Sequence, residues 1–290
     1  MSQIFVFGTG RCGSTHLQRV ITLSTRCWIW GEHEGFLEPL LTSLGRYETG
    51  QRLERFVFSR ASRDEGQLIA EMTTGSHMLS WLNPFDKGEF RAEVRSLIDR
   101  MFRSHIPEGW TDWGFKEIRY GLDNNSPEIL LNLFPDATGI FVFREPKSTM
   151  ESMMRTWSPK LLDEPHNIDR LSKIYCSYKI RWKKVMKYFL DCDIRFGNRI
   201  VFVSFDKLDS STAALLRTFG LVPTRPIPAR LSITNRGPRK LPEWASNKFD
   251  ELFAEDAPAC LDLFERACTR SDADFTACAS EPVEDQPVFG

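Results

Sequence analysis

The chain has 290 residues, 41% of them hydrophobic, which is enough for one large α/β domain or two smaller domains. Its 38 basic and 39 acidic residues nearly balance, so the overall charge gives no reason to expect a nucleic acid as partner. Seven scattered cysteines without a C-x-x-C pair argue against a disulfide framework or a zinc site, and with no leader or membrane-spanning apolar run in view we expect a cytoplasmic protein.

The first predicted element is a strand over Ile4–Phe7, which a glycine-rich turn follows at once. A helix over Ser14–Ser24 comes next, and then a short strand over Cys27–Trp30. Residues 35–65 are predicted to be helical, and Leu68–Glu71 to form a further strand. The order of strand, turn, helix and strand at the start of the chain is typical of α/β proteins.

The remaining predicted elements alternate in the same way. In chain order they are a helix over 88–105, a strand over Trp113–Ile118, a strand over Thr138–Phe143, an amphipathic helix over 168–190, a strand over Arg199–Phe205, and a helix over Ser211–Phe219 that Gly220 ends. This alternation predicts a single α/β domain over residues 1–280, with a central parallel sheet flanked by helices. The acidic, proline-bearing tail over 281–290 is expected to be loose.

The amphipathic helix over 168–190 carries many lysines away from its apolar face. They are Lys173, Lys179, Lys183, Lys184 and Lys187. We expect these side chains to lie on a solvated face of the helix.

The turn after the first strand aims several backbone N–H groups at one point in front of a helix, which is typical of a phosphate site. Gly8 and Gly13 have the spacing of the Walker loop. Ser14, however, stands where that motif needs a lysine to hold the β- and γ-phosphates. The sequence therefore disfavours an ordinary ATPase or kinase.

The same turn also matches the dinucleotide fingerprint. Gly8-x-Gly10-x-x-Gly13 is followed by Glu32, at about the distance of an acid that would hold a ribose hydroxyl. The bulky Arg11 counts against this interpretation, because the pyrophosphate needs a close approach to the backbone. A Rossmann-type NAD(P)-dependent oxidoreductase nevertheless stays open as an alternative.

The polar residues of the turn favour a third interpretation. Arg11, Ser14 and Thr15 add a cation and two hydroxyl groups, which suits a compact tetrahedral anion. In Gly10-Arg11-Cys12-Gly13-Ser14-Thr15 the chain resembles the sulfotransferases that use 3′-phosphoadenosine 5′-phosphosulfate (PAPS), with glycine in place of their usual proline. The resemblance implies that these six residues bind the 5′-phosphosulfate, and that the domain has the P-loop NTPase-like sulfotransferase architecture.

A second motif follows the strand over Thr138–Phe143. Arg144 stands at the strand end, and Ser152 falls eight residues later on a helix that Pro146 begins. A guanidinium and a hydroxyl so placed can grip one phosphate. Sulfotransferases bind the 3′-phosphate of PAPS with an arginine and a serine at this spacing, so the resemblance implies that role for Arg144 and Ser152. Arg236 and Arg239, in a basic loop, are weaker candidates for the same phosphate.

The resemblance also implies catalytic roles. Arg11 is the cation expected near the bridging oxygen of the donor. Glu32 is expected to be the base, because tyrosylprotein and several bacterial sulfotransferases place a glutamate after the second strand, and a partly buried carboxylate with a raised pKa can accept a proton. Glu34 and His33 are rivals for this role, and His105 is a further one, since cytosolic members use a histidine.

Lys116, at the end of the predicted strand over Trp113–Ile118, is expected to deliver a second cation to the leaving phosphate oxygen, unless it simply pairs with Glu117. The function implied is metal-free transfer of a sulfuryl group from PAPS to a hydroxyl or amine of a small molecule, such as a specialised natural product, with adenosine 3′,5′-bisphosphate as the second product. Aromatic residues that could line the acceptor site, or simply fill the core, are Trp28, Trp30, Trp81, Trp110 and Trp157. A nucleotide-binding protein without catalysis remains a further alternative.

Overall fold

The computed structural model of the chain describes residues 3–50, 65–74, 86–121, 125–163, 165–209, 212–225 and 241–279. The strands are β1 (Gln3–Gly8), β2 (Cys27–Trp30), β3 (Asp112–Lys116), β4 (Thr138–Phe143) and β5 (Ile200–Ser204). The helices are α1 (Ser14–Ser24), α2 (Glu38–Thr49), α4 (Glu65–Thr74), α5 (Lys87–Arg103), α6 (Ser126–Leu133), α7 (Pro146–Trp157), α8 (Ile168–Phe196), α9 (Thr212–Thr218), α10 (Glu243–Ala254) and α11 (Ala257–Ala279).

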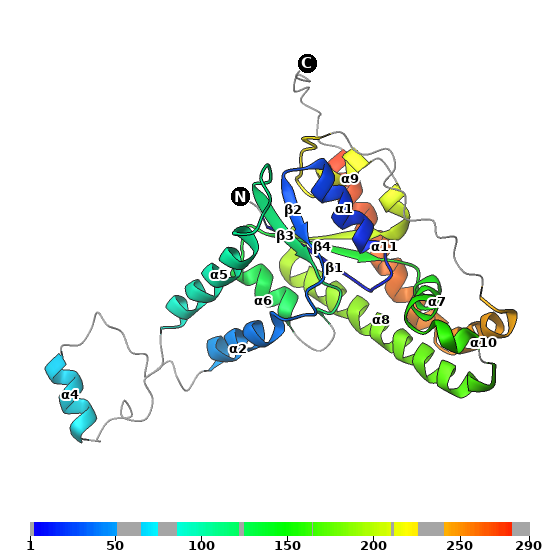
Figure 1. Cartoon of the computed structure of the whole chain (residues 1–290), viewed down its shortest axis with the longest axis horizontal. Helices are drawn as coiled ribbons and strands as arrows, with labels where there is room; N and C mark the ends of the chain where they lie inside the picture. The colour runs from blue at the N-terminus through cyan, green and yellow to red at the C-terminus, as the bar shows by residue number, and fades with distance from the viewer. Residues whose placement is uncertain are drawn as a thin grey trace, which may run out of the picture.

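All five strands are parallel and follow the order β2-β3-β1-β4-β5, with helices on both sides of the sheet (Figure 1). The predicted α/β fold with a central parallel sheet is therefore confirmed. β1 lies between β3 and β4, and β3 separates it from β2. In the Rossmann order β2 is the direct neighbour of β1, which lets an acid at its end reach the ribose. The observed order does not place Glu32 in that way.

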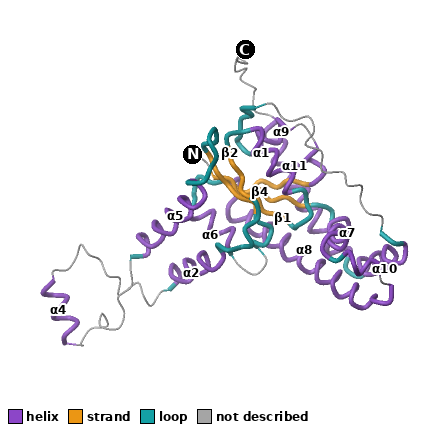
Figure 2. Tube along the Cα trace, in the orientation of Figure 1, coloured by secondary structure: helices purple, strands orange, loops and turns teal. Residues whose placement is uncertain are grey.

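The two faces of the sheet bury different kinds of side chain because successive residues of a strand point to opposite sides. Phe5 and Phe7 of β1 belong to an aromatic core that α5, α6 and α8 cover. Ile4 and Val6 belong to an aliphatic core under α1 and α9. The stacked rings of Phe141 and Phe189, with centroids 4.2 Å apart, join β4 to α8 on the aromatic side. Figure 2 shows the strands between these helices.

Most predicted elements are confirmed with small shifts at their ends, but one is wrong. The predicted strand over Leu68–Glu71 lies inside α4. A short apolar run does not distinguish a strand from a helix, and the surrounding glutamine, alanine and methionine favour a helix. Of the helical stretch predicted over 35–65, α2 ends at Thr49, and residues 51–64 lie outside the described part of the chain, as does the tail over 281–290.

The interpretation of one α8 lysine is also wrong. Lys179 is only 6% exposed, and its Nζ donates to the carbonyl oxygen of Leu252 at 2.7 Å. This carbonyl lies in the last turn of α10, where carbonyl groups lack partners and a cation is favourable. Lys179 therefore fastens α10 to α8. Its role depends on a contact between distant segments, which helical periodicity does not reveal.

The free edge of β5 is covered from the carboxyl-terminal part of the chain. Asp274 of α11 accepts a hydrogen bond from the backbone N–H of Phe202 at 2.9 Å. An unpaired edge strand invites pairing with other chains, and a helix that satisfies its N–H removes that option. Among the described helices, none is both long enough and apolar enough to cross a bilayer.

Candidate active site

The candidate site lies at the carboxyl ends of the parallel strands, and Figure 1 shows the direction in which these strands run. The chain passes from β1 over β3 to reach β2, and from β3 over β1 to reach β4, so the strand order switches around β1. Ligands of open α/β sheets bind at the carboxyl ends of strands at such a switch point. The segments that follow β1, β2, β3 and β4 bring most of the predicted site residues to this end of the sheet.

The loop after β1 has the backbone conformation of an anion-binding turn. Gly10, Arg11 and Gly13 all have positive φ, at 78°, 52° and 88°. Gly13 is also the N-cap of α1 and gives the helix no side-chain cap. The first N–H groups of α1 and those of the loop therefore face the space in front of the helix, where the dipole favours a negative charge.

Glycine is required at Gly8 by a close approach of the chain. A Cβ there would lie 2.6 Å from Sγ of Cys12 and 2.8 Å from the carbonyl oxygen of Val142. Cys12 is itself fully buried under the loop, so only its backbone can face a ligand. Arg11 and Thr15, in contrast, are exposed.

The structure brings the two predicted phosphate motifs together. Nε of Arg11 donates to Oγ of Ser152 at 3.3 Å, although the residues lie 141 positions apart. Arg11 belongs to the loop after β1, and Ser152 to the second turn of α7. A single ligand that carries two anionic groups can therefore contact both motifs at once.

Arg144 lies in the same region and lacks a carboxylate partner. Its guanidinium stacks over the ring of Phe205 at 4.3 Å, and among the described residues no carboxylate lies within ion-pair distance. Burial and the positive charges of Arg155 and Arg11 lower the pKa of Arg144. Three guanidinium groups so close to one another favour a polyanion between them.

Sequence reasoning missed Arg155. Its Nη1 lies 3.6 Å from Oε2 of Glu151, one turn back on α7. Arg155 is three residues after Ser152, and residues at this spacing are neighbours on a helix surface. Following the helix face that carries Ser152 would have found it.

Lys116 and Glu32 form the centre of the second part of the site. Nζ of Lys116 donates to Oε1 of Glu32 at 2.6 Å and to Oγ1 of Thr15 at 3.1 Å. Nη1 of Arg119 lies 3.3 Å from the other carboxylate oxygen of Glu32. The expected alternative, a pair between Lys116 and Glu117, is not formed, because adjacent strand residues point to opposite faces of the sheet.

Glu117 holds the turn that presents Glu32. It is fully buried, and its carboxylate accepts hydrogen bonds from the backbone N–H groups of His33, Gly35 and Arg119, and from Nη1 of Arg119 at 2.8 Å. Burial opposes ionisation, but the hydrogen bonds from Arg119 and Gly35 outweigh it and keep the pKa of Glu117 below its usual value. This carboxylate is part of the scaffold and does not reach the loop after β1.

The three rivals of Glu32 are placed differently. His33 packs its ring against Phe115, and its Nε2 is 2.9 Å from the hydroxyl of Tyr120, so it faces the aromatic core. Glu34 is exposed, as Glu32 is, but has a positive φ of 56° and makes no contact with Lys116. His105 is exposed in the turn after α5, and no hydrogen bond or ion pair joins it to the described site residues. Of the four candidates only Glu32 contacts Lys116, which in turn contacts the loop.

Two predicted ligands, Arg236 and Arg239, lie outside the described residues. No group of histidine, cysteine, aspartate and glutamate side chains in the described ranges is arranged to hold a metal ion.

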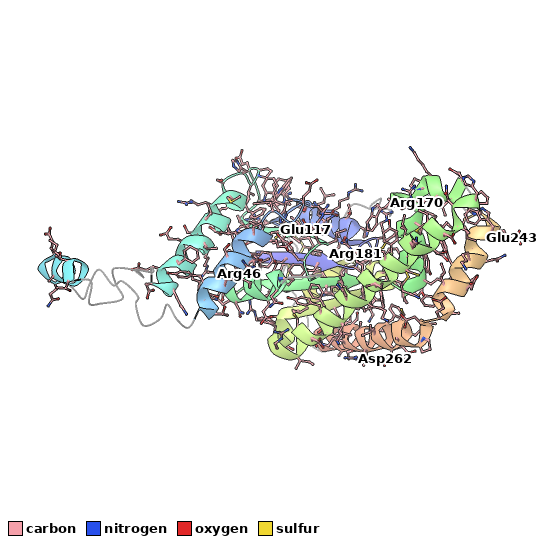
Figure 3. The ribbon with its side chains drawn as sticks, turned by 90° about the horizontal axis from the view of Figure 1, so that it is seen from below. Arg46, Glu117, Arg170, Arg181, Glu243 and Asp262 are labelled. Atoms are coloured by element: carbon pink, nitrogen blue, oxygen red, sulfur yellow. The ribbon has the colours of Figure 1, made fainter. Side chains whose placement is uncertain are left out.

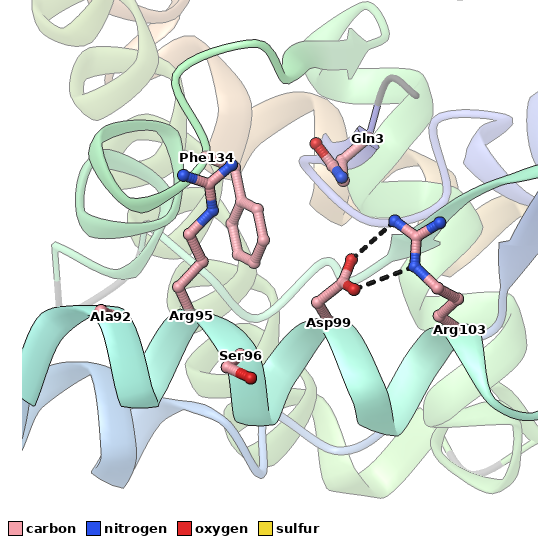
Figure 4. Close-up of a pocket in the computed structure, with 7 residues that line it drawn as sticks. All are labelled: Gln3, Ala92, Arg95, Ser96, Asp99, Arg103 and Phe134. Carbon is pink, nitrogen blue, oxygen red and sulfur yellow. Dashed lines mark hydrogen bonds and ion pairs between the residues drawn. The ribbon is translucent and has the colours of Figure 1, made fainter.

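A cavity of about 380 Å³ lies beside the first residue of β1, at the opposite end of that strand from the candidate site, and Figure 4 shows the residues that line it. Gln3, which begins β1, lines it together with residues of α5. In its wall Asp99 accepts from Arg103 at 2.8 Å and from Nε1 of Trp113 at 2.9 Å, while the guanidinium of Arg95 lies over the ring of Phe134 at 5.6 Å. This cavity is separate from the candidate active site.

Comparison with known proteins identifies the sequence family. A model of the sulfotransferase family matches residues 3–218. None of the curated proteins matches the chain. A solved sulfotransferase from Alicyclobacillus acidocaldarius is 13% identical, with 96% of this chain and 99% of that chain covered and a TM-score of 0.49.

Two further solved structures are similar at the same low level. The sulfotransferase domain from the curacin biosynthetic pathway is 16% identical, with 87% of this chain and 97% of that chain covered and a TM-score of 0.47. The sulfotransferase domain from the Synechococcus PCC 7002 olefin synthase is 17% identical, with 88% and 94% covered and a TM-score of 0.43. Such scores carry no argument about function, so the assignment depends on the family match.

Proposed function

Because this chain belongs to the sulfotransferase family, we propose that it transfers a sulfuryl group from PAPS to a hydroxyl or amine of a small molecule. The observation that carries this proposal is the contact between Arg11 and Ser152 at 3.3 Å. It joins the loop that would hold the 5′-phosphosulfate to the helix that would hold the 3′-phosphate, so one nucleotide can span both.

The donor would be held at its two charged ends. The backbone N–H groups of residues 10–15 and the hydroxyls of Ser14 and Thr15 would bind the 5′-phosphosulfate. Arg144 and Ser152, with Arg155 beside them, would bind the 3′-phosphate. The repulsion between the guanidinium groups of Arg11, Arg144 and Arg155 in the free protein would then be offset when the bisphosphate binds.

The chemistry needs a base and a cation at the leaving group. The acceptor oxygen or nitrogen attacks sulfur, the bond between sulfur and the phosphate oxygen breaks, and adenosine 3′,5′-bisphosphate leaves with the electron pair of that bond. Glu32 would take the proton of the acceptor. An ammonium group has three N–H donors, and Lys116 uses two of them for Glu32 and Thr15, so the third is left for the leaving oxygen.

Calorimetry tests the donor site directly. We expect adenosine 3′,5′-bisphosphate to bind the wild-type protein and Arg144→Ala to weaken that binding about 100-fold, because a bidentate, charge-assisted contact is lost. Arg170→Ala, in an exposed position at the start of α8, is the matched control and should bind as the wild type does.

Other outcomes would favour the other functions. Binding of a nicotinamide dinucleotide in place of the bisphosphate would support an oxidoreductase and overturn the proposal. Bisphosphate binding without bisphosphate release from PAPS in the presence of any acceptor of a broad alcohol and amine library would indicate a nucleotide-binding protein without catalysis.

A further inference from the structure

We infer that the acceptor is a hydroxylated carboxylic acid with an aromatic body, and that Arg181 together with Arg119 recognises its carboxylate. This inference depends on the proposed sulfotransferase function and adds the chemical class of the acceptor to it. It starts from a cation on α8 that the donor site does not use. Figure 3 labels Arg181 and Glu117 in the same part of the molecule.

Arg181 is a half-buried guanidinium that the surrounding protein does not neutralise. Its Nη2 donates to the carbonyl oxygen of Ile118 at 3.3 Å, and its Nε is buried without a hydrogen-bond partner among the described residues. In the same ranges no carboxylate lies within ion-pair distance of it. Burial and the positive charge of Arg119 lower the pKa of Arg181. A buried donor and an unpaired charge are both costly, and an anion would relieve both.

The neighbouring carboxylates are already paired with other groups. Glu117 accepts from Nη1 and the backbone N–H of Arg119 and from two further backbone N–H groups. Glu32 accepts from Lys116 and Arg119. The negative charges of both carboxylates influence the pKa of Arg181, but neither carboxylate makes a hydrogen bond or an ion pair with it. Among the described residues no carboxylate is therefore left to neutralise Arg181, and the carboxylate of a bound ligand can take that place.

This anion is distinct from the 3′-phosphate of the donor. The charges that act most strongly on Arg144 are those of Arg155, Asp206, Glu145 and Arg11. Those that act most strongly on Arg181 include the charges of Arg119, Glu117 and Glu32, the proposed base. Arg181 thus belongs to the Glu32 part of the site, where the acceptor has to lie for its proton to reach the carboxylate.

An aromatic surface adjoins these cations. The side chain of Trp157 is 42% exposed, yet it lies against the loop after β1 that would hold the donor. A Cβ added at Gly10 of this loop would be 3.2 Å from the Trp157 ring. This ring meets the ring of Tyr178 edge to face, with centroids 5.6 Å apart, and the Tyr178 hydroxyl is held by Ser158 at 3.1 Å. Tyr178 is three residues before Arg181 and so lies beside it on α8.

The aromatic pair and the guanidinium pair together define the acceptor. The exposed ring of Trp157, against which Tyr178 packs edge to face, offers an apolar surface next to the loop after β1, which suits an aromatic ring. The planar guanidinium of Arg181 can bind a carboxylate through its unused N–H groups, and Arg119 adds a second positive charge beside it, although its Nη1 already contacts Glu117 and Glu32.

Three of the other predicted tryptophans have partners elsewhere, since Trp28 and Trp110 pack edge to face at 5.2 Å, Trp110 donates to the carbonyl of Thr22, and Trp30 donates to the carbonyl of Phe102 at 3.1 Å. Trp81 lies outside the described residues.

The test compares a charged probe with its neutral counterpart. Binding of 3-(4-hydroxyphenyl)propanoate and of its methyl ester is measured by calorimetry in the presence of saturating adenosine 3′,5′-bisphosphate, so that no turnover is needed. The wild type should bind the acid about 10- to 100-fold more tightly than the ester, and Arg181→Gln should remove this preference, as expected for the loss of a charge-assisted hydrogen bond. Arg170→Gln on the same helix is the matched control and should keep the preference.

Each other outcome overturns the inference in a recognisable way. Equal binding of acid and ester by the wild type, or equal weakening of both by Arg181→Gln, would show that Arg181 reads no charge on the acceptor. Loss of bisphosphate affinity in Arg181→Gln, with Arg170→Gln unaffected, would assign Arg181 to the donor instead. If the wild type does not bind the bisphosphate at all, the proposed function itself fails, and the inference with it.

Discussion

Among single residues, Glu32 has the most specific position. One carboxylate oxygen is 2.6 Å from Nζ of Lys116 and the other is 3.3 Å from Nη1 of Arg119. We expect Glu32→Gln to keep its affinity for adenosine 3′,5′-bisphosphate but to lose about 100-fold or more in turnover, because the amide cannot accept the acceptor proton. Calorimetry with the bisphosphate and the rate of bisphosphate release from PAPS measure the two effects separately.

Glu34→Gln is the comparison for this variant, since Glu34 is exposed two residues away. Near-normal turnover of Glu32→Gln together with a loss in Glu34→Gln would move the base to Glu34. A loss of bisphosphate affinity in Glu32→Gln would instead indicate that the carboxylate positions Lys116 at the donor.

Residues that act through neighbours in the sequence were predictable, and those that act through distant contacts were not. The turn over residues 10–15 depends on glycine spacing and a helix start, which are local, and the structure has both. The partner of Lys116 depends on how β2 and β3 lie side by side, so the sequence offered only Glu117 as a partner and did not reveal the contact with Glu32. No local sequence pattern indicates that Glu117 holds the turn after β2.

At the scale of whole elements, the joint between α8 and α10 is the most testable feature. We expect Lys179→Met to destabilise the protein by about 1–3 kcal/mol, because the carbonyl of Leu252 loses its buried charged donor. Chemical unfolding monitored by tryptophan fluorescence would measure the change. Lys187→Met, exposed on the same helix, should stay within about 0.5 kcal/mol of the wild type.

Equal midpoints for the two lysine variants would show that the contact between Lys179 and Leu252 adds nothing to stability.

One wrong prediction of an element and one wrong prediction of a side chain's surroundings have related causes. A short apolar run was read as a strand where α4 forms, and Lys179 was read as solvated because periodicity describes one helix and not what packs against it. Alternating strands and helices, in contrast, were enough to predict the parallel sheet.

For the whole molecule, the surroundings of His33 and Glu117 beside the candidate active site predict a loss of stability in acid. Burial lowers the pKa of His33 from its ordinary value of 6.5, although the nearby charge of Glu117 opposes this. An unfolded chain therefore binds the proton more readily than the folded one, and the stabilisation is complete above about pH 6.5 and is lost as the pH falls below it. Glu117 acts in the same direction further down, because its pKa lies below its ordinary value of 4.5.

Thermal melts across this range should show stability that falls from about pH 7 and falls more steeply below about pH 4.5. His33→Gln keeps a polar group within reach of the Tyr120 hydroxyl but cannot take up the proton, so it should flatten the upper part of the curve and leave the lower part. His105→Gln, in the exposed turn after α5, is the matched control and should follow the wild type. If the stability of His33→Gln also falls with pH as that of the wild type does, groups other than His33 cause the loss of stability between about pH 7 and pH 4.5. Proton uptake by the His33 ring would then not destabilise the turn that carries Glu32.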